Sequence, residues 1–210
     1  MTFPLPTLRM AFAALAFVGP LAAPAAVRAQ GEVLTQESVL HDPEIPVLGN
    51  PDGDVTIVEY FDYHCSYCKA VAPELTKLSN EDGKIRIVMK EWPILGEDST
   101  NAARLALAAK YQGKYREAHN ALISARGRLT GQRVEEILKN AGIDVARATK
   151  DLRVNRKTID ALLARNNAQA EAFGFQATPS FIVGTYRYPG AAPIEHLKQM
   201  IADVRAGKNR

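Results

Sequence analysis

The two cysteines of this 210-residue chain, Cys65 and Cys68, are separated by two residues and closely follow an apolar segment at residues 55–61. That segment lacks the apolar and polar alternation of a half-exposed strand, so it predicts a central β-strand buried on both faces. Cys68 opens a helical pattern, which places both sulfurs on one face of a first helical turn, within reach of a disulfide. Strand, Cys-x-x-Cys turn and helix together predict a redox-active dithiol in an α/β fold.

Cys65 is the expected attacking sulfur because it lies at the N-terminus of the predicted helix. Unpaired backbone N–H groups and the helix dipole stabilise a thiolate there and lower its pKa into the range of roughly 3.5–7.5. Two other interpretations are less consistent with the sequence. A zinc site usually needs four ligands, but the four histidines are scattered along the chain. A purely structural disulfide closing so short a loop would remove little entropy from the unfolded chain. No metal and no cofactor is therefore expected.

Residues 1–29 have the layout of a secretory signal peptide, with Arg9, an apolar stretch and small residues ending at Ala29. We expect cleavage after Ala29. An uncleaved anchor is the alternative, but the apolar stretch is short for a membrane span and is followed by prolines. Removal of residues 1–29 takes away two arginines and no acidic residue, which lowers the formal charge from +3 to +1. A nearly neutral chain gives no support to nucleic-acid binding.

The apolar pattern predicts an N-terminal lead-in followed by a β-α-β unit. Residues 30–54 carry scattered polar residues and are expected to form a short helix or an extended segment, then a turn. The strand at 55–61, a helix at about 66–80 and a second strand at 84–90 form the unit. Such a unit requires parallel strands and a right-handed crossover.

The remainder predicts one domain, residues 55–210, interrupted by helices. From about 98 to 173 the apolar residues recur with a helical period, which predicts an inserted helical block. The strand pattern resumes at 179–183 and 186–188, and an amphipathic helix is expected at about 193–206.

These features together resemble the thioredoxin fold, and the helical block narrows the resemblance to the DsbA family of bacterial thiol-disulfide oxidoreductases. The motifs that carry it, over roughly residues 49–205, are Phe61-Asp62-Tyr63-His64-Cys65-Ser66-Tyr67-Cys68-Lys69, Glu91-Trp92-Pro93-Ile94-Leu95-Gly96 and Ala177-Thr178-Pro179-Ser180-Phe181. The resemblance implies an α/β, thioredoxin-like fold with an inserted helical subdomain. It also implies a periplasmic enzyme that forms disulfide bonds in exported proteins. Its expected partners are unfolded or misoxidised exported proteins and a membrane redox partner.

The resemblance also assigns roles to single residues. Cys65 matches the exposed nucleophile and Cys68 the buried resolving cysteine. Pro179 matches a proline that follows a cis peptide bond, which would hold the backbone of Thr178 beside the sulfurs to pair with an extended substrate. An ordinary trans proline at the start of an edge strand is the alternative. Tyr67 and His64 also belong to the expected substrate-binding surface, together with Thr178 and Pro179.

Glu59 lies in the middle of the buried strand, six positions before Cys65, where this fold usually has a buried acid. Its expected role is to move a proton to or from Cys68 while the mixed disulfide resolves. The alternative is a Glu59 that faces solvent on an edge strand. Lys90 and Glu91 either extend a charge network or form the solvated end of the second strand.

The chain departs from the strongest oxidants of the family. They carry Pro-His between the cysteines, whereas this chain carries Ser66 and Tyr67, so its disulfide should be less oxidising. His64 either compensates in part or is an exposed histidine at a strand end. Thr178 resembles the residue found in periplasmic isomerases. A disulfide isomerase or reductase therefore stays an alternative, as do a Cu(I)-binding protein and a chaperone-like binding protein.

Overall fold

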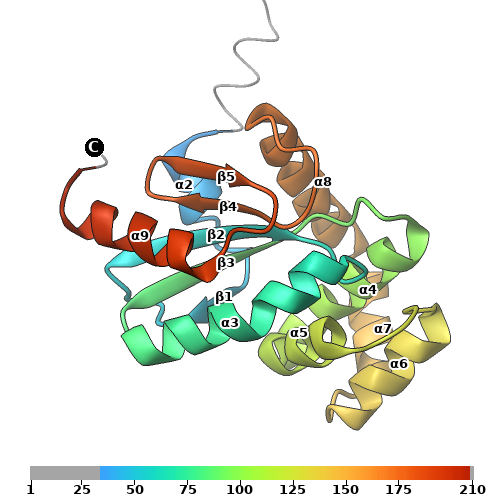
Figure 1. Cartoon of the computed structure of the whole chain (residues 1–210). Helices are drawn as coiled ribbons and strands as arrows, with labels where there is room; N and C mark the ends of the chain where they lie inside the picture. The colour runs from blue at the N-terminus through green and yellow to red at the C-terminus, as the bar shows by residue number, and fades with distance from the viewer. Residues whose placement is uncertain (1–33, 209–210) are drawn as a thin grey trace, which may run out of the picture.

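Five strands form one mixed sheet in the order β1-β3-β2-β4-β5, and the computed structural model describes residues 34–208 (Figure 1). β2 pairs with β3 in parallel, whereas the other neighbours are antiparallel. The α/β, thioredoxin-like fold is as predicted. The strands are β1 Val47–Gly49, β2 Val55–Phe61, β3 Ile85–Glu91, β4 Ser180–Val183 and β5 Tyr186–Pro189.

β2 is the central strand, and its register sorts the charged residues of the sheet onto two faces. Glu59 pairs with Met89, and Phe61 pairs with Glu91. Because side chains alternate along a strand, these residues share one face, whereas Lys90 points to the other. Glu91 is 1% exposed and Lys90 is fully buried. The interpretation of these two residues as a solvated strand end is therefore wrong, because β3 is an inner strand covered by helices on both faces.

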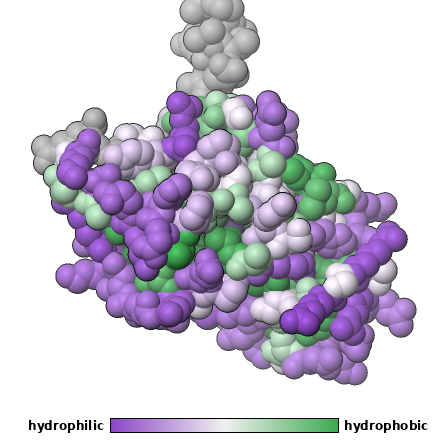
Figure 2. Space-filling model, viewed as in Figure 1, coloured by the Kyte–Doolittle hydropathy of each residue, from purple (hydrophilic) through white to green (hydrophobic). Residues whose placement is uncertain are grey.

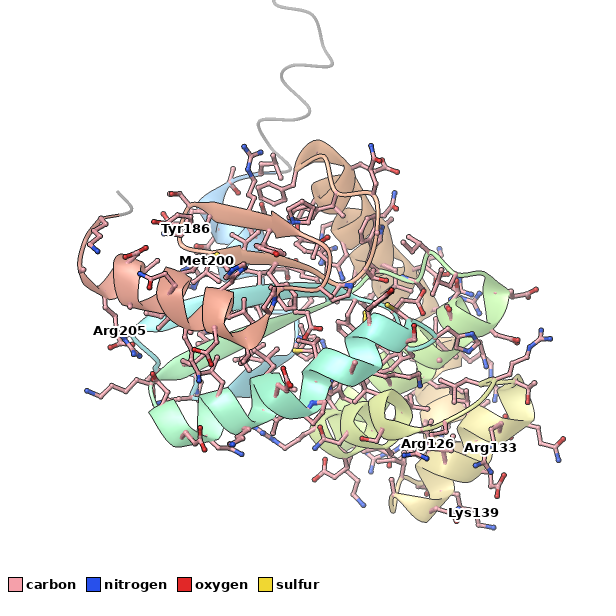
Figure 3. All side chains as sticks on the ribbon, in the orientation of Figure 1. Arg126, Arg133, Lys139, Tyr186, Met200 and Arg205 are labelled. Carbon is pink, nitrogen blue, oxygen red and sulfur yellow. The ribbon has the colours of Figure 1, made fainter. Side chains whose placement is uncertain are left out.

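Helices cover both faces of the sheet (Figure 1). α3 (Ser66–Asp82) and α9 (Ile194–Arg205) lie together on the Glu59 face. Arg205, at the end of α9, forms ion pairs with Asp82 at the end of α3 and with Asp54 just before β2 (Figure 3). α8 (Arg156–Ala172) lies on the opposite face, where Gln169 accepts a hydrogen bond from the Tyr60 hydroxyl. Hydrophilic residues cover most of the surface seen in Figure 2, as expected for the outer sides of amphipathic helices.

The chain between β3 and β4 is helical, as its periodicity predicted. α4 is rich in alanine, and Ala102, Ala106 and Ala109 are fully buried, which lets neighbouring helices approach it closely. The block packs beside the C-terminal ends of β2 and β3. Its helices before α8 are α4 Glu97–Ala109, the 3-10 helix η1 Lys110–Gln112, α5 Tyr115–Ser124, α6 Gly131–Asn140 and α7 Val145–Val154.

The lead-in packs onto the domain as α2 (Gln36–Leu40) followed by β1. The expected short helix is present, but β1 was not predicted, because a three-residue edge strand has too few residues to show a period. The last carbonyls of α2 accept hydrogen bonds from basic side chains of β3, at 3.1 Å from Lys90 and 2.7 Å from Arg86. Cations at a helix C-terminus stabilise it.

The predicted signal peptide, residues 1–29, lies outside the described residues. Within residues 34–208, no helix combines the length and the apolar character needed to cross a membrane.

Candidate functional site

Cys65 and Cys68 lie where β2 runs into α3, and they are not joined by a disulfide in this structure. Cys65 is the N-cap of α3 and has extended backbone angles, so its sulfur accepts a hydrogen bond from the backbone N–H of Cys68 at 3.3 Å. Thiols rarely serve as N-caps, since oxygen side chains are preferred there. The turn therefore aims a capping sulfur at the first turn of the helix.

The two sulfurs have opposite acidities. Hydrogen bonds from the Cys68 thiol, the Thr178 side chain and nearby backbone N–H groups outweigh burial and lower the pKa of Cys65 to about 6. Burial, the hydrogen bond to Cys65 and the charge of Glu59 raise the pKa of Cys68 far above its usual value. At pH 7 the reduced site therefore holds a thiolate at Cys65 and a thiol at Cys68.

The Thr178-Pro179 peptide bond is cis, and it places a carbonyl beside the reactive sulfur. In its thiol form Cys65 donates a hydrogen bond to the Thr178 carbonyl oxygen at 3.2 Å. This contact leaves Cys65 only 6% exposed, which is less than its interpretation as an exposed nucleophile implies. A substrate that pairs with the Thr178 backbone would displace this contact and uncover the sulfur.

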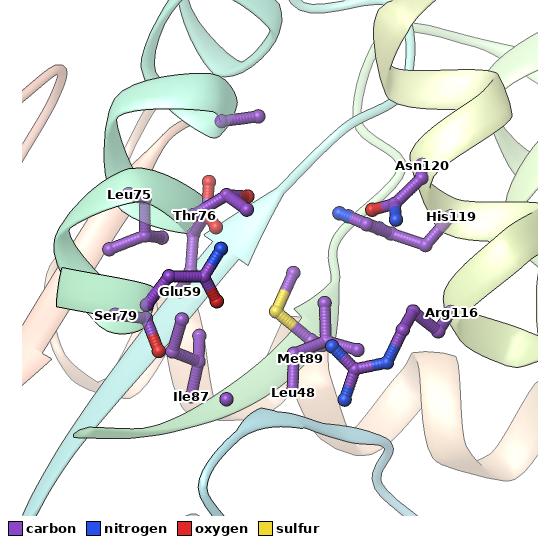
Figure 4. Close-up of a pocket in the computed structure, with 13 residues that line it drawn as sticks. Leu48, Glu59, Leu75, Thr76, Ser79, Ile87, Met89, Arg116, His119 and Asn120 are labelled. Carbon is purple, nitrogen blue, oxygen red and sulfur yellow. The ribbon is translucent and has the colours of Figure 1, made fainter. Parts of the chain in front are cut away.

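Glu59 borders a small cavity between the sheet, α3 and α5, opposite His119, Asn120 and Arg116 of α5 (Figure 4). The carboxyl is 3% exposed. Burial, followed by the negative charge of Cys65, raises its pKa to about 8. A carboxyl that is neutral at pH 7 and electrostatically coupled to both sulfurs can donate or accept a proton there.

Asp62 is a further residue of the site, and no periodicity singled it out. Its buried carboxylate accepts hydrogen bonds from the His64 N–H at 2.7 Å, the Leu95 N–H at 3.0 Å and the Ser99 hydroxyl at 2.7 Å. It therefore joins the active-site turn, the loop after β3 and the first turn of α4. Its place between a buried strand and the Cys-x-x-Cys turn is the one sequence signal that could have identified it.

We expect Asp62→Ala to lower the free energy of unfolding by about 3 kcal/mol or more, because three donors lose a charged acceptor and two of them are backbone groups. Denaturant titration measures this loss. Glu136→Ala is the control, since Glu136 is exposed and pairs only with Arg133 among the ion pairs of residues 34–208, and its effect should stay within about 0.5 kcal/mol. A loss for Asp62→Ala as small as that of the control would contradict this role.

An apolar rim beside the site consists of Tyr67, Ile94 and Leu95. These residues are 67%, 39% and 52% exposed, respectively. The hydrogen bond between Leu95 and Asp62 places the loop beside the active-site turn. His64 is half-buried and its Nε2 lies 3.3 Å from the Leu129 carbonyl oxygen, so it contacts the helical block rather than solvent alone.

Lys69 links α3 to the end of α5. Its ammonium group donates hydrogen bonds to the carbonyl oxygens of Leu122 at 3.2 Å and Ala125 at 2.6 Å. These bonds fix the helical block against the helix that carries the cysteines. Among residues 34–208, no group of three or more histidine, cysteine or acidic side chains has the arrangement of a metal site.

Known proteins resemble this chain over most of its length. The family model described as thioredoxin matches residues 41–203. A thioredoxin-like oxidoreductase from Silicibacter pomeroyi is 40% identical, with a TM-score of 0.79 over 82% of this chain and 98% of that one. The thiol-disulfide exchange protein alpha-DsbA2 from Wolbachia pipientis is 28% identical, with a TM-score of 0.76 over 87% of this chain and all of that one.

The curated relatives are much longer proteins. A Na⁺/H⁺ antiporter from Salinispora arenicola is 28% identical over 77% of this chain, but the match covers 25% of the antiporter. The chain therefore spans about a quarter of the length of the curated relatives that it matches.

Proposed function

Because the chain belongs to the thioredoxin family and is a DsbA-like thiol-disulfide oxidoreductase, we propose that it introduces disulfide bonds into exported proteins in the periplasm. Its substrates on this proposal are unfolded or misoxidised proteins, and a membrane redox partner reoxidises it. The signal-peptide pattern of residues 1–29 supports the location.

The observation that carries the direction of the reaction is the stabilised Cys65 thiolate. A dithiol whose reduced form is stabilised gives up its disulfide readily, which makes the couple oxidising. Thiolate pKa values run from about 3.5 in the strongest oxidant of this fold to about 7 in thioredoxin. In this chain the Cys68 N–H donates to Cys65 Sγ at 3.3 Å at the N-terminus of α3, which supports a stabilised thiolate with a lowered pKa.

The exchange proceeds in two steps. A substrate thiolate attacks Cys65 Sγ, the Cys65–Cys68 bond breaks, and Cys68 leaves with the electron pair and takes a proton from Glu59. A second substrate thiolate then attacks the substrate sulfur of the mixed disulfide and releases Cys65 as its stable thiolate. The substrate loses two electrons and gains a disulfide, and the enzyme becomes a dithiol.

The surface beside the two cysteines supports unfolded proteins as substrates. The backbone of Thr178 beside Pro179 can pair with an extended segment, as strands do at an exposed edge. The apolar rim of Tyr67, Ile94 and Leu95 offers hydrophobic contacts that an unfolded chain can satisfy and a folded one cannot.

An oxidative refolding assay tests the proposal. The oxidised enzyme, added in stoichiometric amount to a reduced unfolded protein with several cysteines, should consume two substrate thiols for each enzyme disulfide. An isomerase would instead act on a scrambled, fully oxidised substrate. Transfer of no disulfide in either assay, with tight binding of Cu(I) or of unfolded chains, would reject the proposal in favour of a binding protein.

A further inference from the structure

We propose that Glu91 is a second proton-holding acid of this enzyme, coupled to the cysteine pair through a buried cluster of Tyr115, His119 and Tyr63. The inference rests on the proposed thiol-disulfide exchange and adds a group that controls its pH dependence. Glu91 touches neither sulfur, so it acts through other residues and is a positioning residue.

Glu91 is buried and only half paired. Its Oε1 accepts a hydrogen bond from the Tyr115 hydroxyl at 2.6 Å, whereas its Oε2 is buried without a hydrogen-bond partner among residues 34–208. Burying an ionised carboxylate that has one oxygen without a hydrogen bond costs free energy. Burial accordingly raises the pKa of Glu91 to about 7. A buried acid that can hold a proton at neutral pH, on the same sheet face as Glu59, is more than a structural group.

Tyr115 connects Glu91 to a cluster of aromatic rings. Its ring stacks on the ring of His119, with the two centroids 5.9 Å apart. The Tyr63 hydroxyl lies 3.2 Å from Nδ1 of His119. Tyr63 precedes Cys65 by two residues, and the charges of both Glu91 and Glu59 raise its pKa. Tyr63 therefore lies between the two acids and beneath the active-site turn.

The hydrogen bond between Glu91 and Tyr115 depends on the charge of Glu91. The Tyr115 hydroxyl donates to ionised Glu91, whereas protonated Glu91 can donate to Tyr115 in return. Burial and the charge of Arg116 lower the pKa of His119 to about 3, so the ring is neutral at pH 7 and adds no positive charge to the cluster.

His119 connects this cluster to the cavity of Glu59. Its ring lines that cavity, and Figure 4 shows it facing Glu59 from α5. Ala72, Thr76, His119 and Asn120 also line an open groove between α3 and α5 at the surface. His119 therefore borders both the cavity of Glu59 and the open groove.

Other charged groups near Glu91 favour its ionised form without pairing with it. Lys110 of η1 and Lys90 of β3 both lower its pKa, but less than burial raises it. Lys90 points to the opposite face and donates to the Ser38 carbonyl oxygen. The amide of Asn166 in α8 donates to the backbone carbonyl of Glu91, so it does not neutralise the carboxylate. Among residues 34–208, Tyr115 is therefore the side chain that hydrogen-bonds to the carboxyl of Glu91.

The test is the equilibrium constant between the enzyme and glutathione, measured from pH 5.5 to 8.5 for the wild type and Glu91→Gln. Glutamine keeps the shape and can still accept from Tyr115. The two curves should coincide at low pH, where Glu91 is neutral. Above pH 7 the variant should favour the reduced form about 3-fold or more, because it lacks the negative charge that ionised Glu91 adds to the cluster around Tyr63.

Tyr115→Phe removes the hydrogen bond that lowers the pKa of Glu91 but keeps the acid, so it should move the inflection of the curve to higher pH. Tyr60→Phe is the matched control, since it removes a buried hydroxyl from the opposite face of the sheet and should reproduce the wild-type curve. Redox-difference infrared spectra give a second readout, in which Glu91→Gln should remove one protonated carboxyl band.

The inference would be overturned if wild type, Glu91→Gln and Tyr115→Phe gave curves of the same shape and the same infrared difference spectrum. That result would leave the proposed thiol-disulfide exchange intact. If Glu91→Gln does not fold, the curve and spectrum of Tyr115→Phe decide alone. A wild type that does not exchange with glutathione at any pH would instead reject the proposed function.

Discussion

Cys68→Ala should trap substrate proteins on Cys65 as covalent mixed disulfides, and the catalysed rate of substrate oxidation should fall by about 10³-fold or more. The reason is that Cys68 holds the disulfide in the oxidised enzyme and resolves the mixed disulfide when the reaction runs backward. Non-reducing electrophoresis of cell extracts, followed by reduction, measures the trapped species. Trapping should be fastest above pH 6, where Cys65 is a thiolate.

Cys65→Ala is the matched control, because it removes the other sulfur from the same turn. It should form almost no mixed disulfide, since the buried Cys68 is held as a thiol by its raised pKa. Equal trapping by the two single variants, or none by either, would contradict the assignment of Cys65 as the attacking sulfur. Clients that bind Cys68→Ala without a covalent bond would indicate a chaperone.

Glu59→Gln should slow resolution of the mixed disulfide by about 10²-fold at pH 7, because general acid–base catalysis at the sulfur is lost. In the mixed disulfide Cys65 carries no charge, so one of the two causes that raise the pKa of Glu59 disappears. Glu59 can then ionise and accept the proton of Cys68. Rapid-quench measurement of a preformed mixed disulfide gives the rate.

The same variant should stabilise the reduced protein in a pH-dependent way. The pKa of Glu59 rises from 4.5 to about 8 on folding, so the unfolded chain ionises first as the pH rises. Wild type therefore loses stability between about pH 4.5 and 8, and the loss is complete above pH 8. Glu59→Gln should lack the part of this loss that comes from Glu59, with a difference from wild type of about 3–5 kcal/mol at pH 8.5 and little at pH 4.

Denaturant titration under reducing conditions measures this difference. Glu136→Gln removes an exposed acid and should follow the wild-type pH dependence. A Glu59→Gln variant that is equally stabilised at pH 4 and pH 8.5 would show that packing, not the ionisation of Glu59, is responsible.

The sequence predicted the elements that hold the cysteines because they have strong periods. Residues 55–61 are apolar except for Thr56 and Glu59, and the structure places this segment in the centre of the sheet. The amphipathic pattern located α3 and α9 to within a few residues. β1 has only three residues, so it shows no period, and its pairing with β3 depends on contacts far away in the sequence.

The polar residues beneath the site were harder to predict, because burial of a charged residue depends on which strand is central. Glu91 looks the same in sequence at a solvated strand end and in the core. Tyr115 and His119 belong to the helical block, and only the packing of α5 beside β3 brings them to Glu91 and Tyr63. Asp62 likewise acquires its role from the distant Leu95 and Ser99.

The reduction potential of the Cys65–Cys68 couple at pH 7 tests the account most directly. Equilibration in glutathione buffers, followed by the fluorescence of the single tryptophan, Trp92, gives its value. A stabilised Cys65 thiolate predicts a potential less negative than about −200 mV, as expected for a disulfide donor. A potential more negative than about −200 mV would contradict the account and assign the enzyme to reduction of substrate disulfides.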